Sequence, residues 1–123
     1  MKTSDFKKLS VWQLSMDLAC EIYKAIRVLP IEERFALSDQ MRRAAISIPS
    51  NIAEGQRRNS DKEFIHFLSI SRGSAAELQT QLILCNRLEY LKEEYIIEII
   101  SQLESIDRML VGLITSINNR FNQ

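Results

Sequence analysis

Glycine, proline, cysteine and histidine are all rare in this chain of 123 residues, which contains three, two, two and one of them. So few turn-forming residues exclude a β-sandwich or β-barrel built from many short strands. Two cysteines cannot form the disulfide framework of a small secreted domain, and they show no metal-ligand spacing. Because Cys20 and Cys85 both fall within apolar helical patterns, we expect buried free thiols and a cytoplasmic protein.

Net charge and long apolar runs are absent as well. Basic and acidic side chains number 16 each, which excludes a histone-like polycation and an acidic disordered tail. No stretch reaches the ~18 apolar residues of a membrane span, and residues 1–5 do not open a signal peptide. We therefore expect one soluble domain over residues 1–123, with no membrane contact.

The neutral total hides an asymmetry along the chain. Residues 1–62 carry 11 basic and 8 acidic side chains, whereas residues 63–123 carry 5 and 8. Two interpretations stay open. The halves form oppositely charged faces that pack against each other between subunits, or the basic side chains bind phosphate.

What the sequence does contain is a three–four spacing of apolar residues, which is typical of amphipathic α-helices. It predicts helices over residues 10–29, 38–55, 61–85 and 93–117. Ser60 and Glu63 form a capping box at the start of the third. The short connections favour an all-α, antiparallel up-down-up-down four-helix bundle. The predicted core stripes are Trp12, Met16, Ala19, Tyr23 and Ile26; Met41, Ala45, Ile48 and Ile52; Phe64, Leu68, Ser71, Ala75, Leu78, Leu82 and Cys85; and Ile96, Ile99, Leu103, Ile106, Leu110, Leu113 and Ile117.

Pro49 lies inside the second predicted helix. It removes one backbone donor and crowds the carbonyl of Ala45, four residues earlier, so we expect this helix to be kinked at Pro49. Small residues surround the proline and would let a neighbouring helix approach closely.

The fourth predicted helix has more apolar surface than one bundle seam needs. A second stripe runs beside its core stripe and contains Ile97, Ile100, Val111 and Ile114. The first predicted helix also has a second stripe, with Val11, Leu14, Leu18 and Ile22. A helix in a monomeric bundle needs one apolar face of about 100°. The surplus predicts a homo-oligomer, with the second stripe of the fourth helix as its candidate interface.

Candidate catalytic chemistry is sparse. Glu63 and His66 match the Glu-x-x-His motif of di-iron bundles, but such a site needs a second copy of the motif and His66 is the only histidine. The two cysteines lie on apolar stripes, which disfavours a reactive thiolate. No glycine-rich phosphate loop is present. We predict no catalytic residue, no metal and no cofactor, and we expect that the protein is not an enzyme.

Five basic side chains are the candidate nucleic-acid contacts, namely Arg42, Arg43, Arg57, Arg58 and Lys62. Two lie on the second predicted helix and three around the turn that follows it, so all five can share one edge of the bundle. Arginine suits phosphate, and a helix N-terminus adds backbone donors. Because no aromatic residues are interleaved for base stacking, we expect phosphate-backbone contact without base readout. The alternative is a protein–protein interaction module whose arginines are held by neighbouring acids.

The run Arg42-Arg43-Ala44-Ala45, followed by Ile48-Pro49-Ser50-Asn51-Ile52-Ala53-Glu54-Gly55, resembles the signature of one bacterial family. These are four-helix-bundle proteins encoded in intervening sequences of 23S ribosomal RNA. The resemblance extends from about Phe6 to Asn118 and continues at Phe64, Phe67-Leu68, Arg72-Gly73-Ser74 and Glu77-Leu78. The sequence departs from the pattern at Gln79 and Glu89, where a glutamate and a glycine are expected.

The resemblance implies a bundle that assembles into a ring-like homopentamer, with no enzymatic activity and no cofactor. One branch, the accessory variability determinants of diversity-generating retroelements, binds nucleic acid and a reverse transcriptase through a basic surface. Carried onto this chain, the resemblance implies that the four arginines named above contact RNA or DNA. It also implies that Asn51 and Glu54 organise the kink at Pro49 and its interface. Unlike that branch, this chain has no net positive charge.

Overall fold

Four α-helices make up most of the computed structural model, which describes residues 5–121. They are α1 (Ser10–Ile26), α2 (Leu37–Gln56), α3 (Asp61–Arg87) and α4 (Glu93–Phe121), and short 3-10 turns at Phe6–Lys8 (η1) and Ile31–Glu33 (η2) precede α1 and α2. No strand occurs in this range, so the predicted all-α, four-helix class is confirmed. Residues 1–4, on which the expectation about a signal peptide partly rests, lie outside it.

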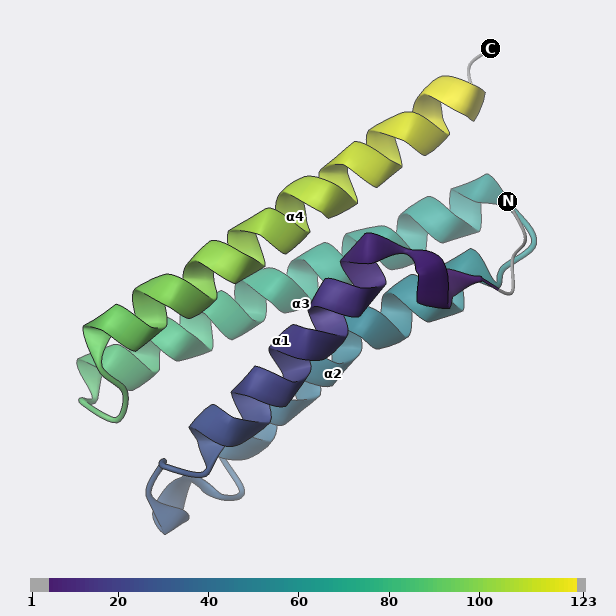
Figure 1. Ribbon diagram of the computed structural model, residues 1–123. Coiled ribbons are helices and arrows are strands. Elements are labelled where there is room, and N and C mark those ends of the chain that lie inside the picture. The colour runs from purple at the N-terminus through teal and green to yellow at the C-terminus, as the bar shows by residue number, and fades with distance from the viewer. Residues whose placement is uncertain (1–4, 122–123) are drawn as a thin grey trace.

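The helices form a four-sided arrangement. Helix α1 packs against α2 and α4, and α3 packs against the same two helices from the other side. In Figure 1 the connections from α1 to α2 and from α3 to α4 lie at the left, and the turn from α2 to α3 lies at the right. The two ends of α2 therefore lie at opposite ends of the molecule.

The core contains the stripes predicted for the second, third and fourth helices. All of those residues are buried except Leu113, which is partly buried. Within residues 5–121, no helix combines the length and the apolar character that crossing a bilayer requires.

Helix α1 turns a different stripe inward from the one predicted as its core. Its buried residues are Val11, Ser15, Leu18, Ile22 and Ala25. Met16 and Tyr23 are 41% and 40% exposed, so they lie on the outer side. The two stripes have the same period, and only the positions of the neighbouring helices decide which of them is buried.

The two cysteines differ in burial. Cys85 is buried, and burial raises the pKa of its thiol to about 11. The expectation of burial is wrong for Cys20, which is exposed. Cys20 follows the buried Leu18 by two residues, or about 200° around the helix, and so faces away from the core.

Two turns position the long helices. Ser60 caps α3 as predicted, since its Oγ accepts a hydrogen bond from the Glu63 N–H at 3.2 Å. Between α3 and α4 the backbone of Glu89 is left-handed, with φ of 62°. The Tyr90 N–H beyond it donates to the carbonyl of Cys85 at 2.8 Å, which closes the end of α3.

Helices α2 and α3 approach each other closely. A Cβ atom added to Gly55 would lie 2.6 Å from the Cβ of Phe67, so only glycine fits there without a shift. Ser71 Oγ donates to the carbonyl of Ile48 at 2.9 Å, next to Pro49. Pro49 is buried within α2, which continues as helix on both sides of it, and the kink stays a prediction.

Candidate nucleic-acid interface

The structure does not bring the five predicted basic side chains together. Arg42 and Arg43 lie near the start of α2, whereas Arg57, Arg58 and Lys62 surround the turn into α3. Arg42 and Arg57 are separated along α2 by about 22 Å, at 1.5 Å per residue. The basic residues thus form two groups at opposite ends of this helix.

The group at the start of α2 is held by local partners. Arg43 Nε lies 3.0 Å from Asp39 Oδ2. Arg42 Nη2 donates to the carbonyl of Arg34 at 3.1 Å and lies 3.8 Å from Asp39 Oδ1. Phosphate would have to compete with these contacts, so this group is a weak candidate for nucleic-acid binding.

The group at the α2–α3 turn is only partly held. Arg58 Nε pairs with Glu54 Oε2 at 3.0 Å, and its guanidinium lies over the Phe67 ring, 4.8 Å from the ring centroid. Arg57 and Lys62 are exposed, and within residues 5–121 their side chains form no ion pair. These two are the basic side chains best placed to meet phosphate.

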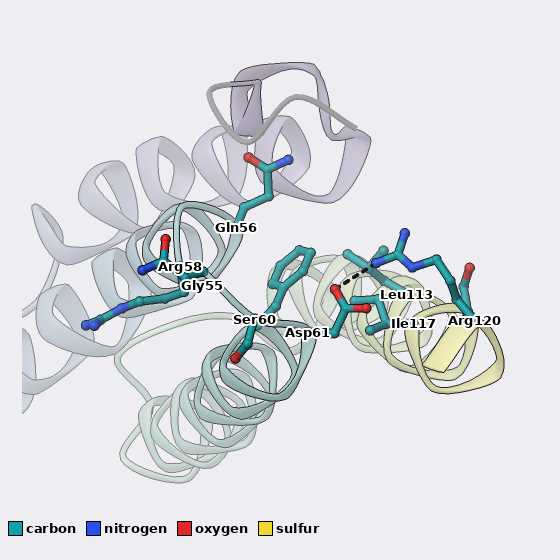
Figure 2. A pocket seen from close by; sticks show the side chains of 11 residues that line it. Gly55, Gln56, Arg58, Ser60, Asp61, Leu113, Ile117 and Arg120 are labelled. Carbon is teal, nitrogen blue, oxygen red and sulfur yellow. Dashed lines mark hydrogen bonds and ion pairs between the residues drawn. The ribbon is translucent and has the colours of Figure 1, made fainter. Parts of the chain in front are cut away.

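A hollow of about 300 Å³ adjoins this turn, between the turn and the C-terminal half of α4. Its walls include Gly55, Gln56 and Ser60 on one side and Leu113 and Ile117 on the other (Figure 2). The ion pair between Asp61 Oδ1 and Arg120 Nη2, at 3.0 Å, spans it. In Figure 2 Arg58 points away from that ion pair. No sequence pattern indicates this ion pair, because Asp61 and Arg120 are far apart in the chain.

Asn51 and Glu54, which are predicted to organise the kink at Pro49, take part in two different contacts. Asn51 Nδ2 donates to the Ser47 carbonyl at 2.8 Å and to Ser47 Oγ at 2.9 Å. Ser74 Oγ of α3 donates to the same Ser47 Oγ at 2.7 Å. Asn51 therefore belongs to the α2–α3 contact beside Pro49. Glu54, by contrast, pairs with Arg58 at the end of α2.

The predicted oligomer-interface residues lie on the outer side of α4. Ile97 is 62% exposed and Val111 is 39% exposed, while Ile100 and Ile114 are partly buried. Between them, Asp107 accepts two hydrogen bonds from Arg72 of α3, at 2.7 and 3.1 Å. These bonds raise the pKa of the Arg72 guanidinium, although burial acts in the opposite direction.

The remaining titratable groups form structural contacts. His66 is exposed and its ring packs edge-on against Phe67, with the centroids 5.5 Å apart. No group of three histidine, cysteine or acidic side chains in the described part of the chain could hold a metal ion. Tyr90 donates to Glu33 Oε2 at 2.8 Å, and this hydrogen bond is the main reason why its pKa is raised.

These features define a small all-α bundle whose polar side chains mainly hold helices and turns together. A family model described as 23S rRNA-intervening sequence protein matches residues 7–112, and the chain belongs to that family. This chain is also similar to a protein of unknown function from the S23 ribosomal protein family of Bacteroides thetaiotaomicron, whose crystal structure is known. The two sequences are 30% identical. The match has a TM-score of 0.79 and covers 85% of this chain and 97% of that one. Among curated proteins, none matched.

Proposed function

We propose that this protein is a non-enzymatic scaffold that acts as a homo-oligomer in the cytoplasm. The observation that carries the proposal is the exposed second stripe of α4, in which Ile97 is 62% exposed and Val111 is 39% exposed. The free thiol of Cys85 suits a reducing compartment. The family resemblance implies five copies in the assembly.

The positions of this second stripe of α4 are regularly spaced. Its positions recur at spacings of four and three along α4, and they are Glu93, Ile97, Ile100, Glu104, Asp107, Val111 and Ile114. A stripe with this period fits against another helix, because it follows one side of an α-helix over three heptads. Apolar residues on it gain free energy when a partner removes them from water, by about 25 cal/mol per Å².

Ile97→Asp tests self-association directly. A carboxylate placed in a dry interface costs several kcal/mol unless it is paired, so we expect the variant to dissociate in light scattering. Ile70→Asp is the matched control, since Ile70 is also exposed, at 37%, but lies on α3 and not on the stripe of α4. A wild-type protein that is monomeric at micromolar concentration would contradict the proposal.

A second candidate function is contact with the phosphate backbone of RNA or DNA. It is favoured by Arg57 and Lys62, which flank the N-terminus of α3 and have no ion-pair partner among the described residues. A ring of copies would repeat this weak site and strengthen binding through avidity. The description of the family refers to 23S ribosomal RNA.

The test is a salt titration of binding to a structured RNA and to a duplex DNA. We expect similar affinities for both and a steep fall with salt, because each neutralised phosphate releases counterions. Changing Arg57 and Lys62 together to alanine should lower the affinity and the salt slope. The control changes Lys24 and Lys92, two exposed lysines elsewhere, and removes the same charge. Equal losses in both variants, or no binding at about 50 mM salt, would exclude this function.

A further inference from the structure

A hollow of about 420 Å³ opens between the end of α1 and the start of α4. It lies at the end of the bundle that holds the α1–α2 and α3–α4 connections, to the left in Figure 1. Sites that bind small molecules usually have volumes of about 300–1,000 Å³. The hollow shares no residue with the second stripe of α4 or with the α2–α3 turn, so it is separate from the surfaces of both functions proposed above.

Most of the residues that line the hollow are apolar. Ala25 and Leu91 belong to the buried core and are 4% and 8% exposed. Val28, which follows α1, also lines the hollow and is 67% exposed. A ligand that covers Val28 removes apolar surface from water, so these walls favour a ligand with an apolar body.

Two tyrosine rings complete the apolar walls, and their hydroxyl groups are already bonded within the protein. Tyr95 donates to Glu21 Oε1 at 3.1 Å, and Tyr90 donates to Glu33 Oε2 at 2.8 Å. Burial and the bond to Glu21 raise the pKa of Tyr95 to about 12, so this hydroxyl stays neutral at ordinary pH. The rings of both residues therefore offer a ligand mainly apolar surface.

Two lysines supply the charge that a ligand can meet. Lys24 and Lys92 line the hollow and are exposed, and neither forms an ion pair within residues 5–121. Among the described residues that line the hollow, Glu21 is the one acid, and its Oε1 already accepts the bond from Tyr95. The walls therefore carry a net positive charge.

Several acids lie near the hollow without lining it. Glu33 accepts the hydrogen bond from Tyr90, on the side of the α1–α2 connection. Water and salt screen exposed charges over about 10 Å, whereas a head group inside the hollow touches Lys24 and Lys92 directly. The direct contacts therefore decide which charge is favoured. The other nearby acids are all exposed, and they are Glu32, Glu93, Glu94 and Glu98.

We propose that this hollow binds a small molecule that has an apolar body and one carboxylate group. The apolar body covers Val28, Leu91 and the two tyrosine rings, and the carboxylate meets the ammonium groups of Lys24 and Lys92. Hydrogen bonds between ionised groups are stronger than those between neutral ones, which favours a carboxylate over an alcohol. The same two lysines repel a cationic head group.

Three probes that share one alkyl chain test the class of ligand, namely octanoate, octanol and octylammonium. Nuclear magnetic resonance of the isotope-labelled protein follows the amide signals of Val28 and Tyr95. We expect octanoate to shift these signals and to bind about fivefold more tightly than octanol, the upper range for one exposed ion pair. Octylammonium should bind most weakly. Octanoate that leaves both signals unchanged, or that binds no more tightly than octanol, overturns the proposal.

Val28→Asp tests the place of binding. The variant removes an apolar wall and brings a carboxylate beside the lysines, so we expect octanoate to bind at least about tenfold more weakly. Ile31→Asp is the matched control, because Ile31 is 71% exposed in the same connection but does not line the hollow. It should keep most of the wild-type affinity. Equal losses in the two variants overturn the proposal, and circular dichroism confirms that both variants fold.

Reversing the charge of both lysines tests their role. In the double variant Lys24→Glu with Lys92→Glu, we expect octylammonium to bind more tightly than octanoate. The control is Lys7→Glu with Lys8→Glu, which makes the same change of charge on η1, at the other end of α1 from the hollow. This control should keep the wild-type order of affinities. If the Lys24 and Lys92 variant also keeps that order, the two lysines do not hold the head group and the proposal is overturned.

Discussion

The α2–α3 contact and the α1–α4 contact hold the same bundle together in different ways. At α2–α3 the backbones lie so close that Gly55 has no room for a side chain, and the Ser71 hydroxyl bonds to a main-chain carbonyl of the neighbouring helix. At α1–α4 the helices are bridged by the long side chains of Tyr95 and Glu21, whose atoms meet at 3.1 Å. The α2–α3 pair is therefore fixed by the shape of its backbones, and the α1–α4 pair by side chains that can adjust.

Gly55→Ala tests the close approach of α2 and α3, and we expect the largest effect from this variant. The new methyl group would overlap Phe67, and the closely packed α2–α3 contact has to open. We expect a loss of about 2 kcal/mol in the free energy of unfolding, within the range for overpacked cores. Gly73→Ala is the control, because nothing lies within 4 Å of its added Cβ. It should gain up to about 1 kcal/mol from helix propensity. Urea unfolding measures the free energy of unfolding of both variants. Equal changes in the two would contradict the close approach of α2 and α3 at Gly55.

Pro49→Ala probes the helix that takes part in the close contact. Alanine in place of proline gains about 3 kcal/mol in a helix interior, while the loss of two buried methylene groups costs about 1.6 kcal/mol. We expect a net stabilisation of about 1.4 kcal/mol, measured by thermal unfolding. If the predicted kink shapes the subunit interface, the variant loses oligomer in light scattering even though its helices are more stable. Unchanged assembly would show that the kink is not needed between subunits.

Ser71→Ala removes the hydroxyl that joins α3 to the Ile48 carbonyl. A buried hydrogen bond contributes about 1 kcal/mol, so we expect a loss of that size in urea unfolding. Thr80→Ala is the matched control, because the Thr80 hydroxyl bonds at 2.9 Å only to Ala76 of its own helix, on the exposed side. If Thr80→Ala loses more free energy of unfolding than Ser71→Ala, the hydrogen bond of Ser71 does not stabilise the α2–α3 contact as proposed.

Tyr95 gives the α1–α4 contact a dependence on alkaline pH. Burial first, and then its hydrogen bond to Glu21, raise the pKa of Tyr95 from 10.0 to about 12. A raised folded-state pKa means that this contribution to stability is complete below pH 10 and is lost as the pH rises toward 12. Stability measured across that window should fall less steeply in Tyr95→Phe than in the wild type. A Tyr95→Phe variant whose stability falls as steeply as that of the wild type would contradict this dependence.

Most of the fold could be predicted from the spacing of apolar residues. The stripe from Phe64 to Cys85 lies in the core because that spacing leaves only one apolar side to α3. On α1 two stripes compete, and the period alone could not show that Val11 and Leu18 are buried while Met16 and Tyr23 are exposed. Only the neighbouring helices decide this.

The candidate site was harder to predict than the fold. Arg42 and Arg57 are both basic residues of one helix, but the length of that helix keeps them apart. Arg42 bonds to the carbonyl of Arg34, which precedes its own helix, and Arg120 bonds to Asp61, which lies on another helix. A sequence shows which charges exist, but pairing depends on distances that arise only when the chain folds.

Glu89 has a consequence for how fast the molecule folds. Its left-handed backbone, with φ of 62°, sits in the turn that must form before α4 can return along α3. A residue with a Cβ atom costs roughly 1 kcal/mol there compared with glycine. Glu89→Gly should remove that cost, and the rates show when it arises. If the α3–α4 turn forms in the rate-limiting step, the variant refolds about fivefold faster; if it forms later, the variant unfolds more slowly by the same factor. The left-handed backbone of this one residue thus makes the α3–α4 turn a marker for the order of folding.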